Sequence, residues 1–153
     1  MANVRKIIIQ GDSILREKSA EVRRFNESLH QLLDDMAITM EAANGVGLAA
    51  PQVGISKKAI VVRDEANNCT LEFVNPVLLS AKGMVEDIEG CLSVPDIQGM
   101  VPRSKKLTIA YQDRNGQAGE MKADGFLARI IQHEMDHLQG RLFIDIMTEE
   151  IKD

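Results

Sequence analysis

Apolar side chains recur every three or four residues in two stretches of the chain, which predicts two amphipathic helices. The first helix is expected at about residues 27–43, with Asn26 as its N-cap and Asn44-Gly45 after its end. The second helix should begin after Asp124, its N-cap, and stop at Gly140. Its apolar side chains are Phe126, Leu127, Ile130, Ile131, Met135 and Leu138. Both helices should therefore pack one face on the core.

Between the two helices, the pattern changes to short runs rich in β-branched and aromatic residues, which predict strands. These runs lie at 59–62, 71–74, 84–88 and 107–111, and a turn at 113–116 should join the last run to a strand near 120–122. A further strand-like run, 142–146, follows the second helix. Strands bracketed by helices predict an α+β fold, with antiparallel β-sheets around the C-terminal helix and an amphipathic helix near the N-terminus. We expect residues 1–153 to form one domain.

The composition narrows the class of protein. A hydrophobic content of 44% and a charged content of 27% are ordinary for a globular chain, and the net charge of -5 argues against direct nucleic-acid binding. The apolar run at 7–9 is too short for a signal peptide, and no apolar stretch could span a membrane. Two cysteines are too few for a disulfide framework, so we expect a cytoplasmic protein, with a single Cys69–Cys91 bridge as the alternative. The short basic run at 103–106 is expected to be a solvated strand end.

The second predicted helix carries the strongest chemical signal, the motif QHEMDH at 132–137. Positions four apart on a helix are displaced by about 40° around the axis and about 6 Å along it, so His133 and His137 can reach one metal ion. Glu134 follows the first histidine, and its carboxylate can address a water on that metal. The alternative is a surface helix with polar neighbours.

A catalytic metal site usually needs a third protein ligand and keeps one position open. The candidates are His30, Cys69, Cys91 and the carboxylates. Cys91 is favoured because Gly90 permits a close backbone approach and strand-like residues beside it would hold the thiolate. A thiolate with two imidazoles suits Zn²⁺, Fe²⁺, Co²⁺ or Ni²⁺, so the ligands alone do not name the metal. The alternative is that Cys91 is a small buried apolar residue.

The segment GVGLAAPQ at 45–52 combines small residues with a terminal amide. Its lack of bulk would let the backbone of another chain approach closely, and Gln52 could donate a hydrogen bond to an oxyanion. The segment lacks the Lys-Ser/Thr ending of a phosphate-binding loop. By itself it is also typical of a helix C-cap and turn.

Taken together, GVGLAAPQ at 45–52, EGCLS at 89–93 and QHEMDH at 132–137 resemble, in order and spacing, the three motifs of the peptide deformylases. The likeness extends to residues 74–76, 101–103, 123–125 and 137–140. The resemblance implies a metal-dependent hydrolase that removes the N-formyl group from the N-terminal methionine of newly synthesised proteins and releases formate. It also implies one divalent metal per chain, Fe²⁺ natively, with Zn²⁺, Ni²⁺ or Co²⁺ as substitutes.

The resemblance assigns roles to individual residues. The implied metal ligands are Cys91, His133 and His137. Glu134 is expected to act as general base and then general acid, while the Gln52 side chain and the Leu92 backbone N–H stabilise the oxyanion. The residues expected to bind substrate, including an apolar pocket for the methionine side chain, are Gly45, Val46, Gly47, Glu89, Gly90, Phe126, Arg129 and Ile130.

Two positions depart from the family pattern. Gln98 stands where many bacterial members carry an arginine that helps to hold the peptide backbone. Arg129 stands where an apolar residue often lines the methionine pocket, so it should either lie across the pocket mouth or face solvent. Arg103 matches a family arginine, and we expect it to pair with Asp136 and support the helix that carries the histidines, unless it is a solvent-facing strand residue.

The expected partners are N-formyl-Met nascent peptides, with no membrane contact. The ribosome is a further candidate, although docking through a long C-terminal helix is not expected because the chain stops at Asp153. Two other functions stay open at this point. A metallopeptidase of the HExxH type would share the water-activation chemistry, but a cysteine ligand argues against it. A catalytically weak, deformylase-like binding module is disfavoured because Glu134 and Gln52 are both intact.

Overall fold

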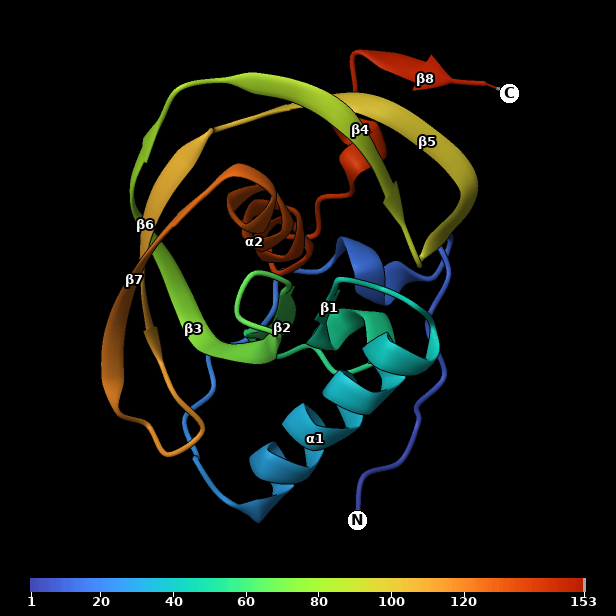
Figure 1. Cartoon of the computed structure of the whole chain (residues 1–153). Helices are drawn as coiled ribbons and strands as arrows, with labels where there is room; N and C mark the ends of the chain where they lie inside the picture. The colour runs from blue at the N-terminus through green and yellow to red at the C-terminus, as the bar shows by residue number, and fades with distance from the viewer. Residues whose placement is uncertain (153) are drawn as a thin grey trace.

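The computed structural model describes residues 1–152 and confirms the predicted α+β fold (Figure 1). One antiparallel sheet has the strand order β1 (Gly47–Ala49), β2 (Ala59–Asp64), β3 (Cys69–Lys82), β6 (Lys106–Gln112), β7 (Ala118–Asp124). A second antiparallel sheet has the order β4 (Val85–Cys91), β5 (Val94–Arg103), β8 (Glu149–Ile151). The helices within these residues are α1 (Glu27–Ala42) and α2 (Gly125–His137), with short 3₁₀ turns η1 (Ser13–Arg16), η2 (Ala50–Val53) and η3 (Phe143–Asp145).

Helix α2 lies in the middle of the molecule, between the two sheets, and α1 lies on the far side of β1 and β2 (Figure 1). Apolar side chains of α2 such as Ile130 and Ile131 share one core cluster with Ile60, Phe73 and Ile109 of the larger sheet. On its other side α2 faces β4 and β5. Because protein surrounds this helix, polar side chains of its last turns are buried instead of solvated.

The helix ends follow the capping signals of the sequence. The Asn26 side chain accepts a hydrogen bond from the Leu29 N–H at 3.1 Å, and Asn44, with φ of 57°, follows the end of α1 in the left-handed region. Asp124 precedes α2 as expected. Helix α2 ends at His137, earlier than predicted, and Gly140 then turns the chain with φ of 76°.

The prediction of a strand at 142–146 is wrong, because this run forms the turn η3. The Asp145 carboxylate accepts a hydrogen bond from the Leu142 N–H at 2.9 Å, which closes the turn. Leu142 and Phe143 are apolar because they pack on Val94 and Val101, not because they alternate in a strand. After α2, the described residues form η3 and β8 and no further helix.

The segment 45–52 is also more than the end of a helix. Its residues form β1 at the edge of the larger sheet and then the turn η2, which contains Gln52. Strand β1 contacts both helices, so this segment lies between α1 and α2. Within residues 1–152, no helix has the length and apolar character needed to cross a membrane.

Candidate metal centre and active site

Three side chains that can bind a metal come together from two elements. Cys91 is the last residue of β4, whereas His133 and His137 lie one turn apart on α2. Their ligand atoms all lie within 4.8 Å of one another, and the Cys91 Sγ is 3.4 Å from the His137 Nε2. A thiolate and two imidazoles at this spacing fit one divalent metal and leave a fourth position open. His30, another sequence candidate, instead bonds to the Arg114 carbonyl at 2.8 Å.

Glu134 is buried beside this cluster. Burial, the largest influence, raises the pKa of its carboxyl group to about 7, and the nearby negative charge of Glu89 adds to the shift, while the positive charge of His133 opposes it. Among the described residues, none hydrogen-bonds to the Glu134 Oε1. A buried carboxylate oxygen without a hydrogen bond from the protein is free to accept one from a water or a substrate. Burial also lowers the pKa of His137 well below its usual value, which favours the neutral ring that binds metals.

Gln52 is fully buried in η2, and its amide orientation is fixed at both ends. Its Oε1 accepts a hydrogen bond from the Ala49 N–H at 2.9 Å, so the NH₂ group is directed toward the cluster. The Gln52 Nε2 lies 3.1 Å from the Ser93 Oγ and 3.6 Å from the Cys91 Sγ. Ser93 is the last residue of the EGCLS motif, and no local pattern in the sequence indicated its contact with Gln52.

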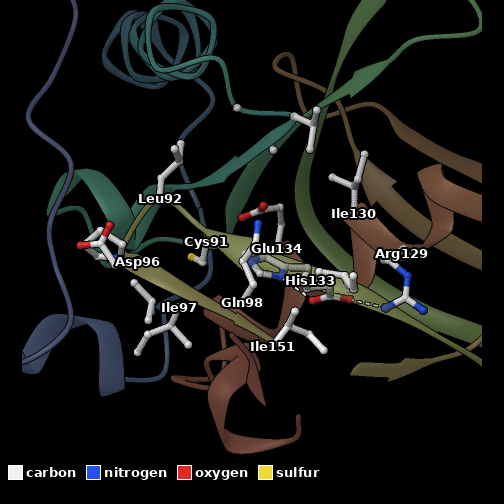
Figure 2. Close-up of a pocket in the computed structure, with 18 of the residues that line it drawn as sticks. Cys91, Leu92, Asp96, Ile97, Gln98, Arg129, Ile130, His133, Glu134 and Ile151 are labelled. Atoms are coloured by element: carbon white, nitrogen blue, oxygen red, sulfur yellow. Dashed lines mark hydrogen bonds and ion pairs between the residues drawn. The ribbon is translucent and has the colours of Figure 1, made fainter. Parts of the chain in front are cut away.

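A cavity of about 760 Å³ opens over these side chains. In Figure 2, Cys91, His133 and Glu134 lie near its middle, with Leu92 and Asp96 to one side and Arg129 and Ile130 to the other. All of the residues expected to bind substrate line it: Gly45, Val46, Gly47, Glu89, Gly90, Phe126, Arg129 and Ile130. Gln98 is exposed at the same cavity, opposite Ile151 of β8, and its effect on peptide anchoring stays a prediction.

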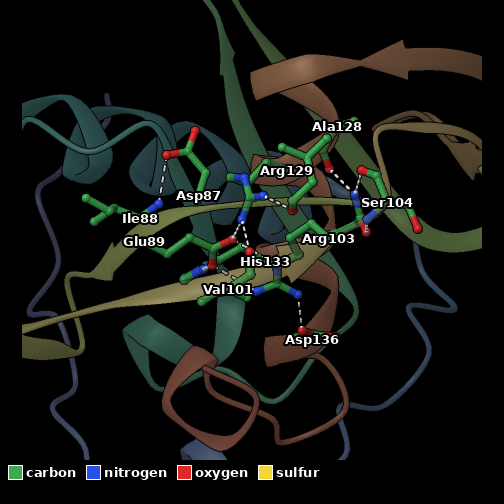
Figure 3. A network of polar contacts seen from close by, with 12 residues as sticks. Asp87, Ile88, Glu89, Val101, Arg103, Ser104, Ala128, Arg129, His133 and Asp136 are labelled. Carbon is green, nitrogen blue, oxygen red and sulfur yellow. Dashed lines mark hydrogen bonds and ion pairs between the residues drawn. The ribbon is translucent and has the colours of Figure 1, made fainter. Parts of the chain in front are cut away.

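Glu89 is the centre of a buried ion-pair network (Figure 3). Its carboxylate accepts two hydrogen bonds from Arg103, both 2.9 Å long, and one from Arg129 at 2.5 Å. Its Oε1 also lies 2.8 Å from the His133 Nδ1. Burial alone would raise the pKa of Glu89, but its bonds to His133 and Arg103 outweigh burial and lower the pKa to about 2. Glu89 therefore orients one histidine of the cluster, a contact that the sequence analysis did not foresee.

The two arginines of this network are buried, whereas the sequence left open that either of them faces solvent. Arg103 is only 5% exposed, and its Nη1 lies 2.5 Å from the Asp136 Oδ2, so the predicted pair is confirmed and a solvent-facing Arg103 is wrong. Lys105 and Lys106, at the other end of the basic run, are exposed as expected. The Arg103 side chain extends from the end of β5 to Asp136 of α2 and to the buried Glu89 of β4. Arg129 does not face solvent either: it bonds to Glu89 and to the backbone carbonyls of Val85 and Val101.

A buried glutamate next to a Cys-His-His cluster, in an open cavity, is typical of the hydrolases that use a metal to activate water. Comparison with known proteins specifies the class further. The family model for polypeptide deformylase matches residues 4–153. The peptide deformylase of Caldicellulosiruptor bescii is 49% identical over 154 residues, covering 97% of this chain and 92% of the relative. That of Pelotomaculum thermopropionicum is 50% identical over 142 residues, covering 93% and 90%.

Solved structures agree. A peptide deformylase from Legionella pneumophila aligns with a TM-score of 0.91 at 42% identity, covering 95% of this chain and 87% of that chain. A class I type b peptide deformylase from Acinetobacter baumannii with bound Met-Ala-Ser aligns with a TM-score of 0.90 at 38% identity, covering 96% and 100%. The chain therefore belongs to the polypeptide deformylase family of enzymes, which confirms the resemblance found in its motifs.

Proposed function

We propose that this chain is a metal-dependent deformylase that removes the N-formyl group from the N-terminal methionine of newly synthesised proteins and releases formate. The observation that carries the proposal is the Glu134 Oε1, which has no hydrogen-bond partner among residues 1–152 and lies 4.0 Å from the His137 Nε2, beside the Cys91, His133 and His137 cluster at one open cavity. Family membership supports it. The Met-Ala-Ser bound to the Acinetobacter baumannii relative has the sequence that formyl-Met-Ala-Ser would leave behind.

Cys91, His133 and His137 would hold one divalent metal. When bound, the metal would act as a Lewis acid that lets a water molecule ionise near neutral pH. We take Fe²⁺ as the native ion because the resemblance to the family implies it. Zn²⁺, Ni²⁺ or Co²⁺ would be substitutes, since the mixed sulfur and nitrogen ligands suit all four ions.

The remaining groups would move protons and stabilise charge. A Glu134 pKa of about 7 suits a carboxylate that takes a proton from the attacking water and returns it to the departing methionine amine. The Gln52 NH₂ group and the Leu92 backbone N–H would donate to the formyl oxygen as its negative charge develops. Because Ala49 and Ser93 hold the Gln52 amide, this donor would need little reorganisation during the reaction.

The methionine side chain would occupy the apolar part of the cavity, against Val46, Phe126 and Ile130. The formyl group would lie near the Gly45-Val46-Gly47 backbone, where an acetyl methyl group would not fit. Since the substrates would be nascent chains, we expect residues 1–153 to act as one catalytic domain in the cytoplasm, near ribosomes.

Product analysis tests the proposal. Protein purified without oxygen and loaded with Fe²⁺ or Ni²⁺ is given formyl-Met-Ala-Ser or acetyl-Met-Ala-Ser, and formate and peptide masses are measured. We expect formate and intact Met-Ala-Ser from the first peptide and no reaction with the second. Cleavage between residues would instead identify a metallopeptidase, and no turnover with either metal would identify a binding module.

A further inference from the structure

We propose that Arg129 is a positioning residue for the metal ligands, which acts through Glu89 to fix the ring of His133 and the spacing between α2 and β4. The inference rests on the proposed function, because it requires a metal at Cys91, His133 and His137. The need for such a residue follows from the fold. Cys91 is the last residue of β4, whereas His133 and His137 lie on α2. The three ligands therefore keep their geometry only if the distance between β4 and α2 is fixed.

The Arg129 guanidinium spans this gap. Its Nη1 donates to the Glu89 Oε2 at 2.5 Å and to the Val101 carbonyl at 2.8 Å, and its Nη2 donates to the Val85 carbonyl at 2.7 Å. One side chain of α2 thus bonds to both β4 and β5 (Figure 3). Its side chain is only 8% exposed, so water competes little for these donors.

Glu89 connects Arg129 to the metal ligand His133. Its Oε2 accepts from Arg129 and its Oε1 faces the His133 Nδ1, so the carboxylate cannot rotate without breaking one of the two contacts. With its Nδ1 engaged by Glu89, His133 has its Nε2 left for a metal. Arg129 lies one helical turn before His133, and so the same carboxylate ties together two successive turns of α2.

The charge of Glu89 also depends on Arg129. Two guanidinium groups, Arg103 and Arg129, face the buried Glu89 carboxylate, while Asp136 pairs with Arg103 and, at 3.6 Å, with Arg141. Removing Arg129 leaves Glu89 with Arg103 as its one guanidinium partner and takes a donor from the Val85 and Val101 carbonyls. Arg103 alone still holds Glu89, so we expect a loosened site and not a lost one. A lysine keeps the charge but cannot reach all three acceptors with a planar fork.

Metal binding tests this inference apart from catalysis. Co²⁺ is titrated into the metal-free whole chain, and its affinity and thiolate-to-cobalt absorption are recorded for wild type, Arg129→Met and Arg129→Lys. We expect Arg129→Met to weaken Co²⁺ binding about 10–100-fold, the usual effect of losing an outer contact to a ligand, and to alter the absorption. The Co²⁺ affinity of Arg129→Lys should lie between those of wild type and Arg129→Met. The lysine variant also tests the inference if the methionine variant does not fold.

Arg5→Met is the matched control, because Arg5 pairs at 2.8 Å with Asp35, a carboxylate as buried as Glu89, between the N-terminal segment and α1. It should lower stability and leave Co²⁺ affinity unchanged. In a Glu89→Gln background, Arg129→Met should weaken binding less than it does in wild type, since part of its effect passes through Glu89. Equal Co²⁺ affinity and absorption in wild type and both Arg129 variants, or full additivity with Glu89→Gln, would overturn the inference alone. A wild type without Cys91-dependent Co²⁺ binding would overturn the metal proposal as well.

Discussion

Gly47 on β1 packs directly against Glu134 on α2. A Cβ atom at Gly47 would lie 2.5 Å from the Glu134 Oε2 and 2.8 Å from the Ile130 Cγ2. No other residue fits there unless helix or strand moves, because both neighbours belong to a packed helix in the core. A glycine is therefore needed at position 47, because the β1 backbone approaches the Glu134 carboxylate, which we propose as the general base.

Gly47→Ala should therefore lower kcat/KM by at least about 10-fold, because the new methyl group displaces Glu134 from its working position. Gly45→Ala is the comparison: its Cβ would meet the end of the flexible Leu92 side chain at 2.8 Å, which can move at lower cost. We expect the Gly45 variant to lose less activity. Steady-state kinetics, with circular dichroism to check the fold, compares the two, and equal losses would contradict this explanation.

Glu134 and Cys91 should separate catalysis from metal binding. Glu134→Ala should keep near-stoichiometric metal and lose turnover by about 10²–10⁴-fold, the typical contribution of general acid–base catalysis. Cys91→Ala should lose metal and activity together, since it removes one of three ligands. Elemental analysis after dialysis, beside formate assays, gives both readouts. Loss of metal from the Glu134 variant would show that this carboxylate is a ligand.

The stability of the fold should depend on pH through Asp35, which lies on α1. Burial by itself would raise the pKa of Asp35, but hydrogen bonds from the Asn3 N–H, Arg5 and Gln31 outweigh burial and lower it. A carboxylate with a lowered pKa stabilises the folded state above its unfolded pKa of about 3.9, and this contribution is lost as the pH falls through the folded value.

Asp35→Asn should then lower the free energy of unfolding on the order of 1 kcal/mol at neutral pH, the size of a net hydrogen bond. The difference from wild type should shrink when the pH is lowered to about 3. Urea titrations of the metal-free proteins at both pH values measure it. A difference that is the same at both would mean that the charge of Asp35 is not what stabilises this contact.

The sequence predicts well those features that depend on nearby residues. The positions of His133, Glu134 and His137 follow from helical spacing alone, and the ends of α1 follow from Asn26 and the Asn44-Gly45 pair. Cys91 required a choice among several candidates, because a contact between β4 and α2 joins residues more than 40 positions apart. Gly90 and the strand-like residues beside Cys91 favoured it, the motif resemblance implied the same ligand, and the structure brings the three side chains together.

Contacts between elements that are far apart in the sequence could not be predicted from local sequence patterns. Strand β5 was not predicted, because Pro95, Gly99 and Pro102 interrupt its β pattern. Arg129 interrupts an apolar helix face, and nothing near it in the sequence indicates that Glu89, 40 residues earlier, would neutralise its charge. The apolar run at 142–146 could not be told from a strand, since burial against Val94 and Val101 and strand alternation both favour apolar residues.

The methionine pocket yields the last prediction. Ile130 is 4% exposed and forms a deep wall of the cavity, whereas Phe126 is 58% exposed and lies toward its outer side. Full burial of a methionine side chain is worth about 1.5–3 kcal/mol, so replacing formyl-Met-Ala-Ser by formyl-Ala-Ala-Ser should lower kcat/KM by roughly 10–150-fold.

Ile130→Ala should shrink this preference for methionine, because it removes contacts that only the longer substrate makes. Phe126→Ala should shrink it less, since most of that side chain remains in water even when the cavity is filled. The measurement is the ratio of kcat/KM for the two peptides in each variant, which cancels losses common to both substrates. If Phe126→Ala changed the ratio more than Ile130→Ala, the methionine side chain would lie toward the mouth of the cavity and not against its deep wall.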